Sequence, residues 1–189
     1  MKRSLLGLVL LCFFFQVKAE KTVRCLIETA MGKIRIELYP EKAPLTVANF
    51  LKYVDTKLYD GTTFFRVCTP ENEKDRKVKI EVVQGGEVVE SRQFKPVMME
   101  TTAQTGIKHT NGAISMARDE PNSATSSFFI CINDQPELDF AGERNPDGQG
   151  FAAFGHVTGG MDVVRKIQAL KESGQYLVEP VKIKAIRRL

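Results

Sequence analysis

The stretch Lys33-Ile34-Arg35-Ile36-Glu37-Leu38 alternates polar and apolar residues along its whole length. A period of two is typical of a β-strand that buries one face. The segment 23–29 before it is also rich in apolar residues, and Met31-Gly32 lies between the two at a position suited to a turn. The sequence therefore predicts an antiparallel hairpin over residues 23–38.

Two helices are predicted, and most of the chain separates them. Pro44 opens the first, at a position where its missing N–H costs nothing. An apolar face with helical spacing follows, made of Val47, Phe50, Leu51 and Val54. The second helix covers 161–170, and its inward side is expected to carry Met161, Val164, Ile167 and Leu170.

The rest of the chain consists of short strands and polar loops. The most polar loops are 69–79 and 141–150, and 101–112 is a third. Strands are expected at 64–68, 81–84, 113–117, 128–132, 152–157 and 181–187. So many strands with two helices exclude an alternating parallel α/β fold. They suit one antiparallel β-barrel domain over 20–189, with a helix covering each open end.

The N-terminal residues 1–19 have the layout of a secretory signal peptide. Lys2 and Arg3 precede an eleven-residue apolar run, and Val17 and Ala19 provide small residues at a cleavage site. Eleven apolar residues are too few to span about 30 Å of hydrocarbon. We therefore expect cleavage before residue 20, no stable membrane insertion afterwards, and a periplasmic or secreted mature protein.

The charge of the mature chain is close to neutral. The full sequence carries a formal net charge of +4, and residues 1–19 contain Lys2, Arg3 and Lys18 but no acidic residue. Removing them lowers the net charge to +1. This balance offers no electrostatic reason to bind nucleic acid.

The cysteines and histidines of the mature chain form no metal-binding motif. Cys25, Cys68 and Cys131 are odd in number, so they cannot all pair within one chain. Cys25 and Cys131 lie in apolar runs, where a free cysteine packs as a small hydrophobic residue. His109 and His156 are far apart, and no ligand spacing surrounds either. We expect no metal and no cofactor.

Four segments carry the functional information: FFRV at 64–67, VQGG at 83–86, NGAISMA at 111–117 and SSFFI at 126–130. Their order and content resemble the cyclophilin family of peptidyl-prolyl cis-trans isomerases, over essentially all of 23–189. The resemblance implies a mainly β fold, a closed eight-stranded antiparallel barrel capped by two helices. It also implies a monomer that isomerises X–Pro bonds in proline-containing polypeptides and assists the folding of exported proteins. The alternative is a cyclophilin-like peptide-binding chaperone or assembly module with little isomerase activity.

Prolyl isomerisation needs a fixed hydrogen-bond donor rather than a nucleophile. Amide resonance sets a barrier of about 18–20 kcal/mol, and the twisted state leaves a lone pair on the prolyl nitrogen. A donor directed at that nitrogen stabilises the twisted state without a covalent step. The resemblance assigns this catalytic role to Arg66, whose guanidinium is always charged and donates in a rigid fork.

The resemblance also assigns a substrate-binding set. Phe129 forms the floor of a proline pocket, lined by Val82 and Leu138, while Gln84 holds the substrate backbone. Phe64 and Phe151 complete the set. Successive residues of a strand point to opposite faces, so one of Phe128 and Phe129 is free to face a groove. Gly85 and Gly86 are expected to permit close approach of the substrate, and His109 is expected to be structural.

Several positions depart from the family pattern. Glu81 stands where a phenylalanine is usual, Ser127 where a glutamine is usual, and Glu137 where an aromatic residue is usual. Phe151 replaces a histidine or tyrosine. Because an unpaired buried carboxylate is costly, Glu81 is expected at the pocket rim or beside a base. We expect weak cyclosporin binding, and an altered groove partly covered by the loops 69–79 and 141–150.

Overall fold

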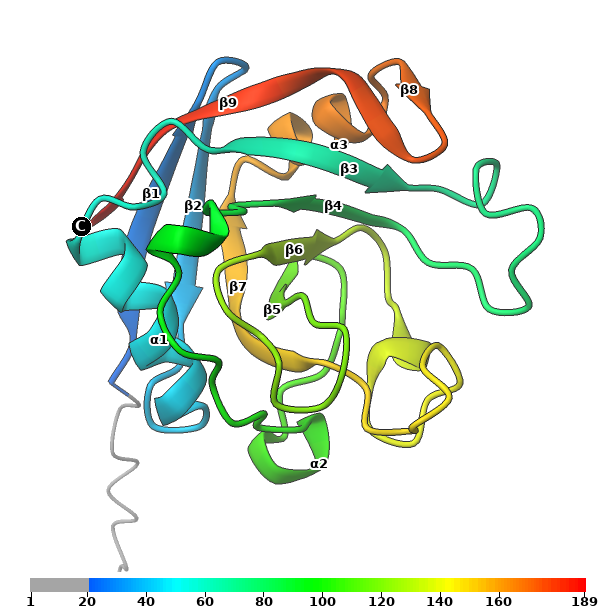
Figure 1. Ribbon diagram of the computed structural model, residues 1–189, viewed down its shortest axis with the longest axis horizontal. Helices are drawn as coiled ribbons and strands as arrows, with labels where there is room; N and C mark the ends of the chain where they lie inside the picture. Colours follow the sequence, from blue (N-terminus) through cyan, green and yellow to red (C-terminus); the bar gives the residue numbers. More distant parts are fainter. Residues whose placement is uncertain (1–20) are drawn as a thin grey trace, which may run out of the picture.

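The computed structural model describes residues 21–189, so the predicted signal peptide lies outside the described residues. Eight strands form a closed antiparallel barrel in the order β1-β2-β7-β5-β6-β4-β3-β9, and β9 pairs back with β1 (Figure 1). The strands are β1 Val23–Thr29, β2 Lys33–Leu38, β3 Thr63–Cys68, β4 Val82–Gly85, β5 Ala113–Met116, β6 Phe128–Cys131, β7 Ala152–Gly159 and β9 Tyr176–Arg188. The predicted barrel is confirmed, and its hairpin over 23–38 is β1–β2.

The helices pack on the barrel at two separate places. α1, Pro44–Asp55, lies beside β7 and β9, and α3, Met161–Gln168, lies beside β2, β3 and β4 (Figure 1). All four inward residues predicted for α1 are buried. In α3, Val163, Val164 and Ile167 are buried, whereas Met161 and Leu170 are partly buried and pack at the edge of the core. None of the described helices has the length and apolar character that a membrane span requires.

Some short elements were not predicted. α2, Thr102–Thr105, lies in the expected loop 101–112, where Thr101 and Gln104 form a capping box. There are also two short 3-10 helices, η1 at Glu90–Arg92 and η2 at Pro136–Leu138. β9 starts five residues before the predicted strand and forms a hairpin with β8, Glu172–Ser173.

Strand alternation divides the apolar residues into two layers. Phe64, Val83, Phe128 and Ile130 point into the barrel and belong to its main core. Their neighbours on the outer face form a second cluster, which Ile80 and Leu138 cover from the loops. The members of this outer cluster are Cys68, Ile80, Val82, Ala113, Phe129, Cys131 and Leu138. An apolar surface therefore lies outside the barrel wall, over β4, β5 and β6.

A β-bulge interrupts this alternation in β3. Phe64 pairs with Gly85 and Arg66 with Gln84, so Phe65 is an extra residue in the ladder between β3 and β4. A bulge redirects the side chains beside it. Phe65 and Arg66, although adjacent, both reach the outer side, while Phe64 stays inside the barrel.

The three cysteines are free and buried. Burial raises the pKa of Cys25 and of Cys68 to about 11, and it also raises the pKa of Cys131. They pack as small hydrophobic residues, as the sequence predicts for Cys25 and Cys131. Within residues 21–189 no group of three or more His, Cys, Asp or Glu side chains is placed to hold a metal ion.

Candidate active site

A row of directly paired residues crosses the outer face of the barrel. Arg66 of β3 pairs with Gln84 of β4, Gln84 pairs with Phe129 of β6, and Phe129 pairs with Ser115 of β5. On its other side, Arg66 pairs with Tyr176 of β9. Directly opposite residues of antiparallel strands project to the same face. Strand register alone therefore brings a cation, an amide and an aromatic ring together.

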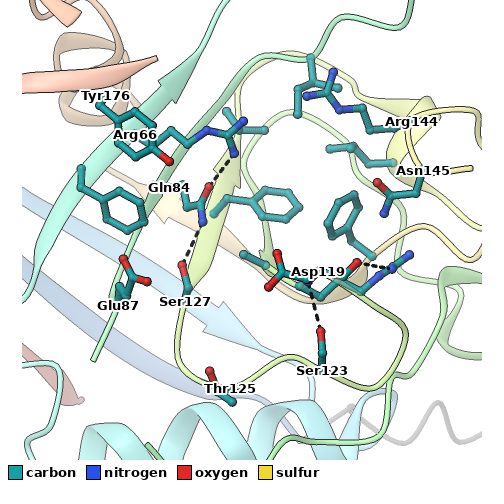
Figure 2. Close-up of a pocket in the computed structure, with 18 of the residues that line it drawn as sticks. Arg66, Gln84, Glu87, Asp119, Ser123, Thr125, Ser127, Arg144, Asn145 and Tyr176 are labelled. Carbon is teal, nitrogen blue, oxygen red and sulfur yellow. Dashed lines mark hydrogen bonds between the residues drawn. The ribbon is translucent and has the colours of Figure 1, made fainter. Parts of the chain in front are cut away.

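Arg66, Gln84, Phe129 and Tyr176 of this row border a cavity of about 590 Å³, and Ser115 lies buried beneath it. Figure 2 shows the guanidinium of Arg66 directed toward the middle of the cavity, with Gln84 and Ser127 below it and Arg144 and Asn145 across from it. Six of the seven predicted site residues line this one cavity, namely Arg66, Val82, Gln84, Phe129, Leu138 and Phe151.

The floor of the cavity is apolar. The ring of Phe129 is 4% exposed and belongs to the outer cluster with Val82, Leu138 and Ile80. Phe151 packs against it edge to face, with ring centroids 5.3 Å apart and planes at 89°. The alternation of Phe128 inward and Phe129 outward agrees with the prediction. Such a floor is suited to bind a small apolar ring, because apolar area is removed from water on contact.

The wall beside this floor carries hydrogen-bond donors. Arg66 donates from Nη1 to Gln84 Oε1 at 2.9 Å, and from Nε and Nη2 to Gln175 Oε1 at 3.0 and 2.6 Å. Gln84 in turn donates to Ser127 Oγ at 3.1 Å. A guanidinium has five N–H groups. These three contacts leave one N–H on Nη1 and one on Nη2 without a protein acceptor, and Arg66 lines the cavity.

Phe64 does not belong to the site. Its side chain is 0% exposed and packs edge to face against Phe128 inside the barrel, with centroids 5.9 Å apart. Phe65 lines the cavity instead and stacks on Tyr176. The assignment of Phe64 to substrate binding is therefore corrected to Phe65. The physical reason is the bulge, which offsets the strict alternation that would place Phe64 and Arg66 on one face.

The glycines after Gln84 make room for two rings of the core. A Cβ on Gly85 would lie 2.6 Å from Cδ1 of Phe64, and one on Gly86 would lie 2.3 Å from Cε1 of Phe128. Gly86 also has φ +75°, a conformation that side chains other than glycine's rarely adopt. Packing against core rings therefore accounts for both glycines, and close approach of a substrate to them stays a prediction.

Glu81 does not stand at the pocket wall. Its carboxylate accepts a hydrogen bond from Asn133 Nδ2 at 3.0 Å, and its preceding neighbour Ile80 lines the cavity instead. The expectation was a place at the pocket rim or a contact with a base, whereas Glu81 is absent from the cavity lining and its partner is an amide. Glu137 is also absent from the lining, and its carboxylate accepts the Glu143 N–H at 2.8 Å. The acidic departures in the sequence therefore leave the pocket floor apolar.

Two loops beside the cavity are joined by a buried ion pair that sequence reasoning missed. Arg144, from loop 141–150, donates to both carboxylate oxygens of Glu73, from loop 69–79, at 2.8 and 2.5 Å. Both side chains are almost fully buried. Burial opposes ionisation of Glu73, but donation from Arg144 and from the Ile80 N–H outweighs it and lowers the pKa of Glu73. No spacing rule relates two residues 71 positions apart, so only their opposite charges hinted at the pair.

His109 supports the floor from below. It contacts Asp139 through Nδ1 at 2.8 Å and Ser115 through Nε2 at 3.0 Å, and its ring stacks on Phe129. Burial lowers the pKa of His109 despite the carboxylate, so the ring is neutral at pH 7. Because a carboxylate only accepts, Nδ1 carries the proton and Nε2 accepts from Ser115. Ser115 is 0% exposed, so this serine, histidine and aspartate have a structural role, as expected for His109.

The chain is similar to known proteins of a single family. The family "Cyclophilin type peptidyl-prolyl cis-trans isomerase/CLD" matches residues 24–188. The chain is 37% identical over 148 residues to peptidyl-prolyl cis-trans isomerase cyp18 of Streptomyces antibioticus, covering 77% of this chain and 82% of that protein. It is 37% identical over 145 residues to peptidyl-prolyl cis-trans isomerase B of Escherichia coli strain K12, covering 75% and 82%.

The fold also matches a solved structure. A crystal structure of a cyclophilin type peptidyl-prolyl cis-trans isomerase from Cryptosporidium parvum superposes with a TM-score of 0.67 at 21% identity, over 89% of this chain and 98% of that one. The same protein was also solved in the presence of the dipeptide Ala-Pro, and that structure gives a TM-score of 0.64.

Proposed function

The chain belongs to the cyclophilin-type family and is a peptidyl-prolyl cis-trans isomerase, and we propose that it acts on exported polypeptides, with Arg66 as the catalytic donor. The observation that carries the assignment of Arg66 is its position. Its guanidinium is held beside the apolar floor around Phe129, with two N–H groups left for a substrate.

In the proposed mechanism the proline ring rests on Phe129, with Val82, Leu138 and Phe151 around it. The N–H groups of Arg66 lie on the polar side of the same cavity. As the X–Pro bond twists, the prolyl nitrogen gains a lone pair, and Arg66 donates to it. This interaction is stronger in the twisted state than in either planar isomer, so it lowers the barrier. Gln84 holds Arg66 and lies beside the substrate backbone.

The Cryptosporidium parvum structure in the presence of Ala-Pro supports the class of substrate proposed here, a proline-containing peptide. The alternative of a binding module with little activity is not favoured, because the family and its relatives are isomerases and Arg66, Gln84 and Phe129 share one cavity. We propose that the mature protein is a monomer.

The experiment that tests the catalytic assignment is Arg66→Ala in residues 20–189. We expect kcat/KM on an Ala-Pro peptide to fall about 10²–10³-fold, the cost of removing one transition-state donor. Arg66→Lys is the matched control, because it keeps the charge and removes the planar fork. It should also lose activity, with both variants folded by circular dichroism. An unchanged kcat/KM in Arg66→Ala would contradict the assignment.

Export is tested by the N-terminus of the mature protein. The positive residues, the short apolar run and the Val17-x-Ala19 site support cleavage before Glu20. Mass spectrometry of protein from the periplasm or medium should find an N-terminus at or within a few residues of Glu20. An intact chain starting at Met1 and confined to the cytoplasm would overturn the proposal of export.

A further inference from the structure

We propose that Gln175 is a positioning residue for catalysis, which orients Arg66 and is itself anchored by the buried Glu73–Arg144 ion pair. The inference rests on the proposed catalytic role of Arg66. It goes beyond that role because it assigns the orientation of the guanidinium to the turn of the β8–β9 hairpin and to two loops beside the cavity.

The contact between Gln175 and Arg66 is bifurcated. A single oxygen, Gln175 Oε1, accepts from Nε at 3.0 Å and from Nη2 at 2.6 Å. Gln84 Oε1 accepts from Nη1 at 2.9 Å on the other side. Two acceptors on opposite edges determine both the position and the plane of a rigid guanidinium. The two N–H groups that have no acceptor here, one on Nη1 and one on Nη2, are the ones available to a substrate.

The backbone at Gln175 argues that its side chain has a specific task. Gly174 and Gln175 form the two-residue turn between β8 and β9, with φ +58° and +76°. Turns with two positive φ values favour glycine, asparagine or aspartate. A glutamine is strained there, and strain of this kind tends to collect at functional sites. Here the strained residue is the one whose side chain reaches Arg66.

Every polar group of Gln175 is engaged. Its N–H donates to Glu172 at 2.6 Å, and its carbonyl accepts from the Val67 N–H at 2.8 Å. Its side-chain Nε2 donates to Glu73 Oε1 at 3.1 Å. Because the amide nitrogen is held by Glu73, the amide oxygen is turned toward Arg66.

Glu73 is a firm anchor for this amide. The residue is 2% exposed and accepts from Arg144, from the Ile80 N–H and from Gln175. Arg144 also donates to the Val78 carbonyl at 2.6 Å. The contacts therefore run without a gap from Arg144 through Glu73 and Gln175 to Arg66. They connect the loops 69–79 and 141–150 to the proposed catalytic group.

The variant that tests the proposal is Gln175→Asn. Asparagine tolerates positive φ and keeps an amide, but it is one methylene too short to reach Arg66. Displacing a catalytic group by about 1 Å can cost on the order of 100-fold in rate. We expect kcat to fall about 10- to 100-fold and KM to stay within about twofold, because the apolar floor that binds proline is untouched. A merely structural role would not separate kcat from KM.

A second measurement reports on Arg66 directly. In the wild type, the Nε–H of Arg66 should give a distinct, slowly exchanging NMR signal, because it donates to Gln175. In Gln175→Asn this signal should shift and exchange faster. If the asparagine variant unfolds, both measurements are repeated on Gln175→Gly, because glycine readily adopts the positive φ of this position. Glu179→Gln, on the exposed side of the same strand, is the control and should behave as wild type.

The double variant separates the two proposals. In the Arg66→Ala background, Gln175→Asn should cause no further loss, because Gln175 acts through Arg66. If Arg66→Ala loses activity as expected while folded Gln175→Asn and Gln175→Gly keep wild-type kcat, the positioning role of Gln175 is overturned and the catalytic role of Arg66 stands. If Arg66→Ala keeps full activity, the catalytic assignment itself fails. A further loss on adding Gln175→Asn to Arg66→Ala would also overturn the positioning role.

Discussion

At the scale of single residues, Phe65 decides which aromatic ring faces the cavity. As the extra residue of a bulge, it joins Arg66 on the outer side and leaves Phe64 to pack against Phe128 in the core. Gly85 and Gly86 complete this arrangement, because the two rings occupy the space that a Cβ would need. The glycines and the bulge thus place the core ring and the site residue on opposite sides of one strand.

Gly86→Ala tests this packing. The new Cβ would lie 2.3 Å from a ring carbon of Phe128 at φ +75°. We expect overpacking and backbone strain together to lower the free energy of unfolding by about 2–5 kcal/mol. Gly106→Ala is the matched control, since φ is +70° but no atom lies within 4 Å of its Cβ. It should lose only about 1–2 kcal/mol in urea denaturation. Equal losses in the two variants would show that backbone conformation, not packing on Phe128, is responsible.

At the scale of elements, the loops 69–79 and 141–150 form one unit beside the cavity. Two ion pairs join them, Glu73–Arg144 in a buried setting and Lys77–Glu143 at the surface. Both contacts are short, but they are expected to contribute differently to the free energy of unfolding. A buried charge that loses its partner remains without water, whereas a surface charge is solvated and screened.

Arg144→Ala and Lys77→Ala measure this difference. Arg144→Ala leaves Glu73 buried without its main partner, so we expect a loss of about 3–5 kcal/mol in the free energy of unfolding. Lys77→Ala removes an exposed partner, and its urea midpoint should match the wild type. Because Glu73 also anchors Gln175, Arg144→Ala should lower kcat as well, while Lys77→Ala should not. A wild-type urea midpoint for Arg144→Ala would show that the buried pair contributes little to the free energy of unfolding.

At the scale of the whole molecule, the pKa shifts of four buried or partly buried groups act in the same direction. Burial lowers the pKa of His109 and of His156 below 6.5. The pKa of Glu73 lies below 4.5 and that of Asp139 below 3.8, because hydrogen bonds to their carboxylates outweigh burial. All four groups bind protons more weakly in the folded state than in the unfolded state. Protonation therefore favours unfolding.

We expect the free energy of unfolding to be greatest near neutral pH and to fall as the pH decreases. The loss begins as the pH passes below 6.5, where the histidines of the unfolded chain become protonated, and it steepens below about 4.5 as Glu73 and then Asp139 contribute. Denaturant unfolding at pH 7.5, 5.5 and 4.0 measures the trend. In His109→Gln, part of the change between pH 7.5 and 5.5 should disappear. A stability that rises from pH 7.5 to 5.5 would contradict these pKa directions.

Local patterns were enough to predict an antiparallel barrel, and the family resemblance located most of the predicted residues that line the cavity. Alternation in 33–38, the helical spacing after Pro44 and the order of short strands are local patterns, and local patterns follow from backbone geometry. Arg66, Gln84 and Phe129 were predicted from the family resemblance, because each lies in one of the short segments that carry it.

The side chains that surround Arg66, Gln84 and Phe129 could not be predicted from local patterns, because they come from distant parts of the chain. The bulge at Phe65, the place of Ile80 instead of Glu81 in the cavity, and the contacts from Arg144 to Gln175 depend on strand register and loop closure. Glu73 and Gln175 are 102 positions apart. No local periodicity relates residues at such a distance, because their contact exists only once the barrel has closed and the loops have packed on its outer face.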